Sequence, residues 1–462
     1  MPRHPSRSPS PDHFGPAPVL PTAEQDKDPL YHPKNGVAPW AYGEPSPGHA
    51  AAPSITHLPL ESACSPLIFG GGVFGAGMYN ADSYIRTDVP LRTLLLAFRY
   101  GVNAIDTSPY YYPSEYILGR LLAALRPIYP RDSYFLFTKC GRYGPDKGDF
   151  DYSPQRVRRS VEASLKRLGS EWLDVVYLHD AEFVAEQVGD PSGMNAARVA
   201  KGDNEALRTL GLAEGDEGKV HGSGDEVILK AVEELLRLKS EGKVRRIGIS
   251  GYPLPVLLRL VRLVAAKYPK SGGLDVVLSY SNHTLHSDIL TPYLDLFKGS
   301  TPTGGPIVFN ASPFSMGLLT DAGPPGWHPA REELKEACRE AGRRIRGQEG
   351  EATLAKTALL YGIRGAETSA KQPTPDGGAD EGLSGVRLRT LLGMSSPEQV
   401  QDAIEAYRVL LAGTAASTGS SQDAERHESL LQAYETQLRN ERIVMEEMDR
   451  AGVRDESWPS GI

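Results

Sequence analysis

The chain has 462 residues, a formal net charge of −8 and no sustained run of lysine or arginine. An acidic chain without a basic tract is not expected to bind nucleic acid as its main partner. No apolar stretch approaches the roughly 20 residues that a membrane-spanning helix needs, and the amino-terminal segment lacks the apolar centre of a secretion signal. Three scattered cysteines without metal-binding spacing fit a reducing compartment. These features predict a cytoplasmic protein with no membrane partner.

Residues 1–60 are rich in proline, serine and histidine and lack periodicity, so we expect this extension to be disordered. From 61 to 421, eight short apolar runs alternate with amphipathic segments. The runs cover residues 67–69, 102–105, 134–137, 173–178, 244–249, 274–278, 306–309 and 388–392. Near-continuous apolar runs are typical of strands that are buried on both faces of a parallel sheet. Eight such strands that alternate with helices predict an α/β fold of the (β/α)8 TIM-barrel type.

Helical patterns fill the intervals between the runs. A serine cap at Ser153 and a proline at the first helical position begin one helix, whose core-facing stripe is Val157, Val161, Leu165 and Leu168. Further helices are predicted over 225–242 and 397–411. Two segments, about 184–224 and 365–386, interrupt the alternation and are interpreted as surface insertions. The carboxyl-terminal part, 422–462, is predicted to be a helical tail that either packs on the barrel or contacts a partner.

Four chemically capable side chains stand where predicted strands end or just after them. They are Asp106, Tyr111, Lys139 and His179. The carboxyl ends of the strands of a parallel barrel meet at one face, where active sites lie. Each residue alone also has a structural explanation, such as a turn cap for Asp106 or packing for Tyr111. Four suitable residue types at consecutive strand ends favour one common site.

In that site Tyr111 can donate or accept a proton. A free phenol has a pKa of about 10, and a nearby ammonium lowers it. Lys139 can supply the ammonium, and Asp106 can hold Lys139 charged and in place. His179 can donate a hydrogen bond to the reacting oxygen and orient the substrate. Such a site suits proton transfer coupled to hydride transfer.

The segment from Asp106 to Gly119 resembles the signature of the aldo-keto reductases, with Asp-Thr-Ser, a tyrosine five residues after the aspartate, then Ser-Glu and Leu-Gly. The resemblance continues through 138–139, 178–179, 247–250, 312–319 and 393–400. It implies a barrel oxidoreductase that binds a nicotinamide cofactor without a Rossmann fold. The lack of a GxGxxG loop is therefore no argument against such a cofactor.

Within this family, the segments 178–183, 248–253 and 311–320 resemble the sugar 1-dehydrogenases that act on L-galactose and D-arabinose. This resemblance implies that an aldose is oxidised at C1 to a lactone, on a route to ascorbate-like acids. In that direction Tyr111, as a general base, takes the C1 hydroxyl proton. Tyr79, in the loop after the first strand, either lines the sugar pocket or packs.

The resemblance also implies a set of cofactor-binding residues, namely Ser250, Ser312, Phe314, Gly317, Gly393, Ser395, Ser396 and Gln399. Many family members that prefer NADP carry a lysine and an arginine at the positions of Gly393 and Gln399. Neither residue can pair a phosphate dianion, so NAD is the predicted cofactor. A one-residue shift of the alignment would instead bring Arg387 or Arg389 near the phosphate.

Three positions depart from the family pattern. Gly251 follows Ser250, Ala311 stands where an aromatic residue often stacks on the nicotinamide, and Leu278 or Ser279 replaces a glutamine. Tyr280 or Asn282 could substitute for the lost contacts. Two alternative functions remain open at this point: an NADPH-dependent aldehyde or ketone reductase, and a non-catalytic regulatory subunit of the same fold.

Overall fold

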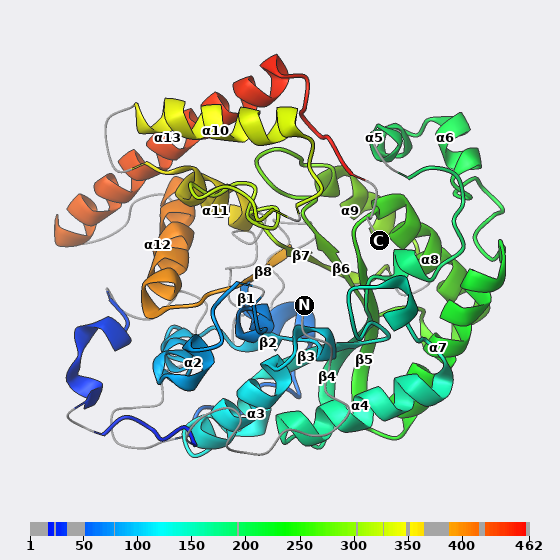
Figure 1. Cartoon of the computed structure of the whole chain (residues 1–462), viewed down its shortest axis with the longest axis horizontal. Coiled ribbons are helices and arrows are strands. Elements are labelled where there is room, and N and C mark those ends of the chain that lie inside the picture. The colour runs from blue at the N-terminus through cyan, green and yellow to red at the C-terminus, as the bar shows by residue number, and fades with distance from the viewer. Residues whose placement is uncertain are drawn as a thin grey trace.

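The computed structural model describes residues 17–22, 25–34, 51–77, 79–191, 194–301, 304–326, 328–347, 352–364, 388–414 and 421–458. At its centre eight parallel strands pair in chain order, and β1 pairs with β8 to close the barrel (Figure 1). The strands are β1 Leu67–Gly70, β2 Ala104–Asp106, β3 Phe135–Cys140, β4 Leu173–Leu178, β5 Val244–Gly251, β6 Val276–Tyr280, β7 Ile307–Ala311 and β8 Arg389–Leu392. Each predicted apolar run overlaps one strand, so the predicted barrel is confirmed.

Helices surround the barrel and cover its outer face (Figure 1). The helices that follow the strands are α2 Val89–Arg99, α3 Ser114–Leu125, α4 Pro154–Leu168, α7 Ser223–Ser240, α8 Leu254–Lys267, α9 Leu290–Lys298, α11 Leu354–Ile363 and α12 Pro397–Thr414. Additional helices are α1 Leu60–Ala63, α5 Asn195–Ala200, α6 Asn204–Thr209, α10 Glu332–Arg346 and α13 Ser421–Arg450. Across the described ranges, no helix is long and apolar enough to cross a membrane.

Aromatic side chains fill the barrel interior. Phe137 on β3 and Phe309 on β7 come from opposite sides of the ring, yet their ring centres lie 5.8 Å apart. Tyr177 on β4 belongs to the same buried cluster. The interior is therefore a packed core and not a channel, as in other barrels of this type. The aromatic layer supports whatever side chains stand above it at the carboxyl ends of the strands.

Helix α4 illustrates how local sequence sets an element. Pro154 occupies its first position. Gly169, in the left-handed conformation at φ 62°, ends the helix, and its backbone N–H donates a hydrogen bond to Leu165 O. Val157, Val161 and Leu168 of the predicted stripe are buried. The predicted hydroxyl cap is wrong, because Ser153 makes no side-chain hydrogen bond to the helix. Its own amide donates to Asp151 Oδ1 at 2.9 Å.

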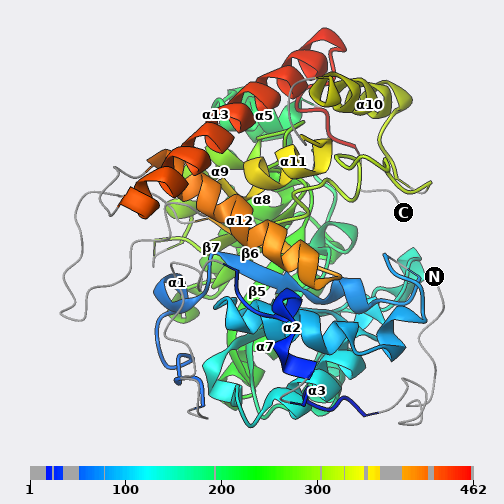
Figure 2. The same ribbon diagram turned by 90° about the vertical axis from the view of Figure 1, so that its left-hand side faces the viewer.

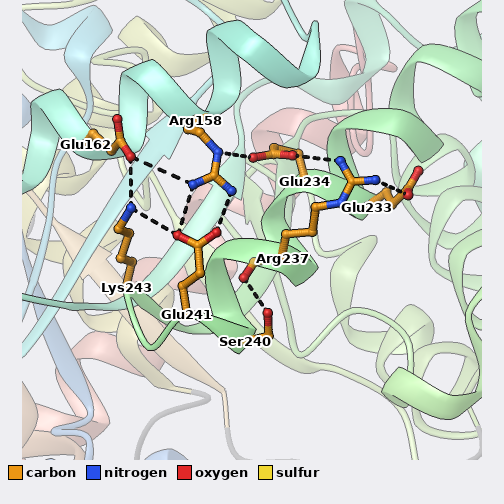
Figure 3. Close-up of polar contacts among 8 residues, drawn as sticks. All are labelled: Arg158, Glu162, Glu233, Glu234, Arg237, Ser240, Glu241 and Lys243. Atoms are coloured by element: carbon orange, nitrogen blue, oxygen red, sulfur yellow. Dashed lines mark hydrogen bonds and ion pairs between the residues drawn. The ribbon is translucent and has the colours of Figure 1, made fainter.

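An ion-pair network joins α4 to α7 on the outside of the barrel (Figure 3). Arg158 donates to Glu234 Oε1 at 2.5 Å and to Glu241 Oε1 at 2.6 Å, and Lys243 lies 2.8 Å from Glu162 Oε1. The two cations beside Glu241 lower the pKa of that carboxyl to about 2. Lys243 stands just before β5. The network therefore ties the helices at the amino-terminal end of the barrel, opposite the predicted site.

The first predicted insertion carries α5 and α6, and backbone atoms of the insertion are hydrogen-bonded to a buried ion pair between α7 and α8. Arg259 on α8 donates through Nη1 to Asp225 Oδ2 at 2.6 Å, and its Nη2 donates to Glu186 O at 2.9 Å. The Asp225 carboxylate also accepts from the amides of Glu186 and His221. The second predicted insertion lies outside the described residues.

Helix α13 crosses the outside of the barrel beside α10, α11 and α12 (Figure 2). Val444 and Met448 are fully buried against these helices, whereas residues 424–429 leave most side chains exposed. Gln437 donates to Thr357 O at 2.8 Å, and Arg364 donates to Glu441 Oε2 at 2.5 Å. The carboxyl-terminal part of the helix is therefore packed on the barrel.

Residues 25–34 fall in the extension that we expected to be disordered, but they form two short 3-10 turns against α2 and α12. Arg99 donates to Asp26 Oδ2 at 2.8 Å and to Tyr31 O at 2.9 Å. Gln401 on α12 donates to Leu30 O at 2.8 Å. These bonds from barrel helices hold residues 25–34 in place, and composition alone does not reveal them.

Candidate active site

The four predicted reactive residues are brought together by three neighbouring strands. Asp106 is the last residue of β2, Lys139 lies on β3 and His179 directly follows β4. Because successive strand residues alternate between faces, each of the three stands two residues beyond a residue of the interior cluster. Those interior residues are Ala104, Phe137 and Tyr177. The three reactive side chains thus form the layer above the aromatic core.

Tyr111 reaches the same place from the short 3-10 turn Pro109–Tyr111. Lys139 Nζ donates to Asp106 Oδ1 and, at 3.0 Å, to Thr107 O. The ammonium lies 4.8 Å from the centre of the Tyr111 ring. The rings of Tyr111 and His179 meet edge-on with centres 5.6 Å apart. Asp106, Lys139 and His179 are 1–3% exposed, so their charges and hydrogen bonds act in a largely dry environment.

His179 is held neutral. Burial, Lys139 and Arg142 all lower its pKa well below the ordinary value. Ser108 Oγ lies 3.0 Å from Nδ1. The other ring nitrogen, Nε2, is the one that remains for the oxygen of a substrate.

The pKa of Tyr111 corrects the expectation from sequence. We expected Lys139 to lower it, but burial raises it well above the ordinary value, and the Asp106 and Asp180 carboxylates raise it further. Asp106, whose own pKa is raised by burial against the opposing Lys139 ammonium, offsets the effect of that ammonium. The phenol is therefore protonated in the free protein.

The remaining signature residues build the scaffold and not the chemistry. Ser114 Oγ donates to Gly71 O at 2.7 Å, which ties α3 to the end of β1. Glu115 accepts from Thr138 Oγ1 at 2.7 Å and pairs with Arg167 on α4 at 2.6 Å. A Cβ at Gly119 would lie 1.9 Å from Arg167 O, so only glycine allows α3 to approach the end of α4. These contacts fix the loop that carries Tyr111.

Most of the predicted cofactor residues lie in the loops after β7 and β8, which are paired neighbours. After β7, Ser312, Ser315, Met316 and Gly317 all have positive φ between 49° and 94°, and Phe314 lies within this turn. Such turns expose backbone amides that bind anions. Ser315 Oγ is fully buried and finds no hydrogen-bond partner among the described residues. A buried donor without a partner fits a polar ligand at this turn.

After β8, Ser395 and Ser396 precede α12. Ser396 Oγ accepts from the Gln399 amide at 3.4 Å, while the Ser395 amide donates to Gln399 Oε1 at 2.7 Å. A helix start of this kind favours phosphate groups. The Gln399 side chain takes part in capping, and a Cβ at Gly393 would lie 2.9 Å from Val73 Cγ1. The two loops together fit the phosphates of a dinucleotide.

Other predicted contacts are used within the protein. Ser250, at 2% exposure, accepts from the Asp180 amide at 3.4 Å. Asn282 Nδ2 donates to Tyr252 O and Ser279 Oγ, so its amide joins the ends of β5 and β6. Arg389 donates to Glu61 O and Cys64 O at the amino-terminal end of the barrel. It therefore cannot face a 2′-phosphate, and Arg387 lies outside the described residues.

Three side chains of the site were not predicted. Ser108, two residues after Asp106, contacts His179 as described above. Arg142 follows β3 and pairs with Asp180, whose Oδ2 lies 3.7 Å from His179 Nε2. Asp180 directly follows His179, and this adjacency was the available sequence signal. Tyr79, by contrast, was predicted either to line the sugar pocket or to pack. It is 54% exposed, and a Cβ at Gly72 would lie 3.9 Å from both its ring and that of Tyr111, which places Tyr79 near Tyr111.

A buried lysine–aspartate pair beneath a tyrosine, at the face of a parallel barrel where active sites lie, is an arrangement suited to proton transfer. The profile of the aldo/keto reductase family matches residues 66–416. The chain therefore belongs to the aldo/keto reductase family, whose members are oxidoreductases that use nicotinamide cofactors. The family predicted from the sequence is confirmed.

The chain is also similar to individual proteins of known name. The chain is 32% identical over 400 residues to L-galactose dehydrogenase from Arabidopsis thaliana, a match that covers 86% of this chain and 92% of the relative. It is 33% identical over 350 residues to D-arabinose 1-dehydrogenase from Saccharomyces cerevisiae, covering 76% and 84% respectively. Among solved structures, the holo form of an aldo-keto reductase from Bacillus halodurans matches with a TM-score of 0.44 and 18% identity, over 79% of this chain and 91% of that chain.

Replacement of Gly119 by alanine is expected to lower the free energy of unfolding by about 1–3 kcal/mol, because the new methyl group overlaps the end of α4. Thermal unfolding measures the effect. Gly148→Ala is the matched control, because a Cβ there meets no atom within 4 Å. Equal melting temperatures for the two variants would contradict the scaffold role of Gly119.

The imidazole of His179 is expected to stay neutral as the pH falls through about 6.5, the ordinary histidine pKa. The reason is that burial and two neighbouring cations oppose its protonation. Nitrogen NMR of the folded protein, with His179→Gln to assign the signal, follows the ring directly. A titration midpoint near the ordinary value would show that the ring is not shielded as described.

Proposed function

We propose that this chain oxidises an aldose at C1 to the aldonolactone and passes the hydride to NAD. The observation that carries the proposal is the buried Lys139–Asp106 pair beneath Tyr111, with the His179 ring edge-on to the Tyr111 ring. The two relatives described above are named as dehydrogenases of sugars. Their names supply the substrate class, an aldose close to L-galactose or D-arabinose.

The proposed mechanism divides the work among the four side chains. A nicotinamide cofactor, when bound, would supply the hydride acceptor. His179, neutral, holds the C1 oxygen through Nε2, and Tyr111 takes the proton of the C1 hydroxyl as the C–H bond breaks and the C1–O bond becomes a carbonyl. Tyr111 is a phenol in the free protein, so it first releases its own proton to solvent. The Lys139 ammonium, 4.8 Å from the ring centre, favours the phenolate that then takes the C1 hydroxyl proton. Because the pKa of Tyr111 is raised, the phenolate fraction, and with it oxidation, increases as the pH rises.

Several observations support NAD over NADP. A side chain at Gly393 would press on Val73, and Gln399 is uncharged and engaged in capping. Arg389 is committed to the other end of the barrel. In the part of the chain that the structure describes, none of these three positions offers a free cation to a 2′-phosphate.

The buried thiols of Cys64, Cys140 and Cys338 suit a reducing compartment such as the cytoplasm.

The test is reduction of NAD by the purified chain with L-galactose, D-arabinose, L-fucose and related aldoses, with NADP in parallel and identification of the lactone. We expect turnover with NAD on at least one sugar. Tyr111→Phe should lower kcat by about 10²-fold or more, because it removes the group that takes the proton, while NAD binding stays intact.

Other outcomes would favour the other functions. NADPH-driven reduction of simple aldehydes without sugar oxidation would indicate a reductase. Nucleotide binding without either activity would indicate a regulatory subunit. Full activity of Tyr111→Phe would show that Tyr111 does not transfer the proton.

A further inference from the structure

A second buried ion pair borders the reactive residues. Arg142, in the loop after β3, donates through Nη1 to Asp180 Oδ2. The two side chains are 14% and 8% exposed. A buried pair of this kind is weak evidence for a contribution to stability, because desolvation opposes the attraction. Its place in the site therefore needs another explanation.

The pair lies directly beside the atoms assigned to the reaction. Asp180 Oδ2 is 3.7 Å from His179 Nε2, the atom that holds the C1 oxygen in the proposed function. Arg142 lies 4.2 Å from the centre of the Tyr110 ring, and its Nη2 is 3.3 Å from Tyr110 OH. The Tyr110 ring in turn lies 5.9 Å from that of Tyr111. The positive charge of Arg142 opposes the rise in the pKa of Tyr111 and contributes to the low pKa of His179.

Both partners keep hydrogen-bonding capacity for a ligand. Among the described residues, Arg142 is the one side chain that donates to the Asp180 carboxylate, and a carboxylate can accept about four hydrogen bonds. Arg142 donates to Asp180, to Tyr110 OH and, through Nε, to Gly144 O. A guanidinium carries five N–H donors. A negatively charged acceptor and a positively charged donor thus remain side by side. A hydroxyl group, which both donates and accepts hydrogen bonds, can bind to such a pair.

We propose that Arg142 and Asp180 bind the hydroxyl on the sugar carbon next to C1 and so restrict the enzyme to 2-hydroxy aldoses. This inference rests on the proposed function for the identity of the reacting carbon. Neighbouring oxygens of a vicinal diol lie about a hydrogen-bond length apart. With the C1 oxygen at His179 Nε2, the next oxygen therefore comes within reach of Asp180. The hydroxyl donates a hydrogen bond to the Asp180 carboxylate, and Arg142 donates a hydrogen bond to the hydroxyl oxygen.

The test compares the best aldose with its 2-deoxy counterpart. The wild-type chain is expected to prefer the hydroxylated sugar by about 10²-fold or more in kcat/KM. The 2-deoxy sugar would leave hydrogen-bonding groups of the buried Arg142–Asp180 pair without a partner. In the Asp180→Asn and Arg142→Lys variants, the ratio of kcat/KM between the hydroxylated and the 2-deoxy sugar should fall to within about tenfold. Only kcat/KM for the hydroxylated sugar should decrease. If the pair were merely structural, its replacement would lower kcat/KM for both sugars by the same factor. Unchanged discrimination in both variants would overturn the inference and leave the proposed function in place.

The matched control is Arg131→Lys. Arg131 pairs at 2.7 Å with Asp174, which is fully buried, at the amino-terminal side of β4, away from the site. This variant should lower thermal stability without changing the substrate ratio.

Calorimetric binding of the same two sugars to the NAD-loaded chain separates the two claims. If no sugar is oxidised but the hydroxylated one binds and Asp180→Asn abolishes that binding, the proposed function fails and the sugar site stands. If neither sugar binds nor reacts, both are overturned.

Discussion

The buried ion pair of Lys139 and Asp106 is the interaction on which the candidate site depends. Charges removed from water are costly, and only a partner with good geometry offsets the cost. The register between β2 and β3 provides that geometry, because both side chains rise from the interior face one step above the aromatic core. Neither charge can move away without losing its partner. The ammonium is thereby fixed beneath Tyr111.

The charges of the site balance in pairs. Lys139 is matched by Asp106, and Arg142 is matched by Asp180. Within each pair, the opposite charges have opposing effects on the pKa of Tyr111. Burial therefore dominates this pKa and keeps the phenol protonated in the free protein. The same burial, assisted by the two cations, keeps His179 neutral. The site thus presents a neutral hydrogen-bonding ring and a phenol whose charge state responds to what binds beside it.

The barrel and its four central residues could be predicted because both follow simple periodic rules. Buried parallel strands are apolar throughout, and reactive residues at their ends meet at one face. Arg142 was missed because it lies beyond the strand, where the loop path, including Gly141 at φ 99°, decides the direction of a side chain. The pKa of Tyr111 was predicted in the wrong direction because the depth of burial depends on the whole fold. Whether Arg389 can contact a 2′-phosphate likewise depends on the end of the barrel at which its side chain lies.

The most direct test replaces both members of the central pair at once. Removing one partner would strand a buried charge, whereas Asp106→Asn with Lys139→Met removes both charges and keeps similar volumes. Thermal unfolding and NAD-dependent sugar oxidation are then measured on the same preparation. We expect a folded protein with a melting temperature close to that of the wild type and with turnover largely lost. Retained turnover in the folded double variant would contradict the claim that this pair drives the chemistry.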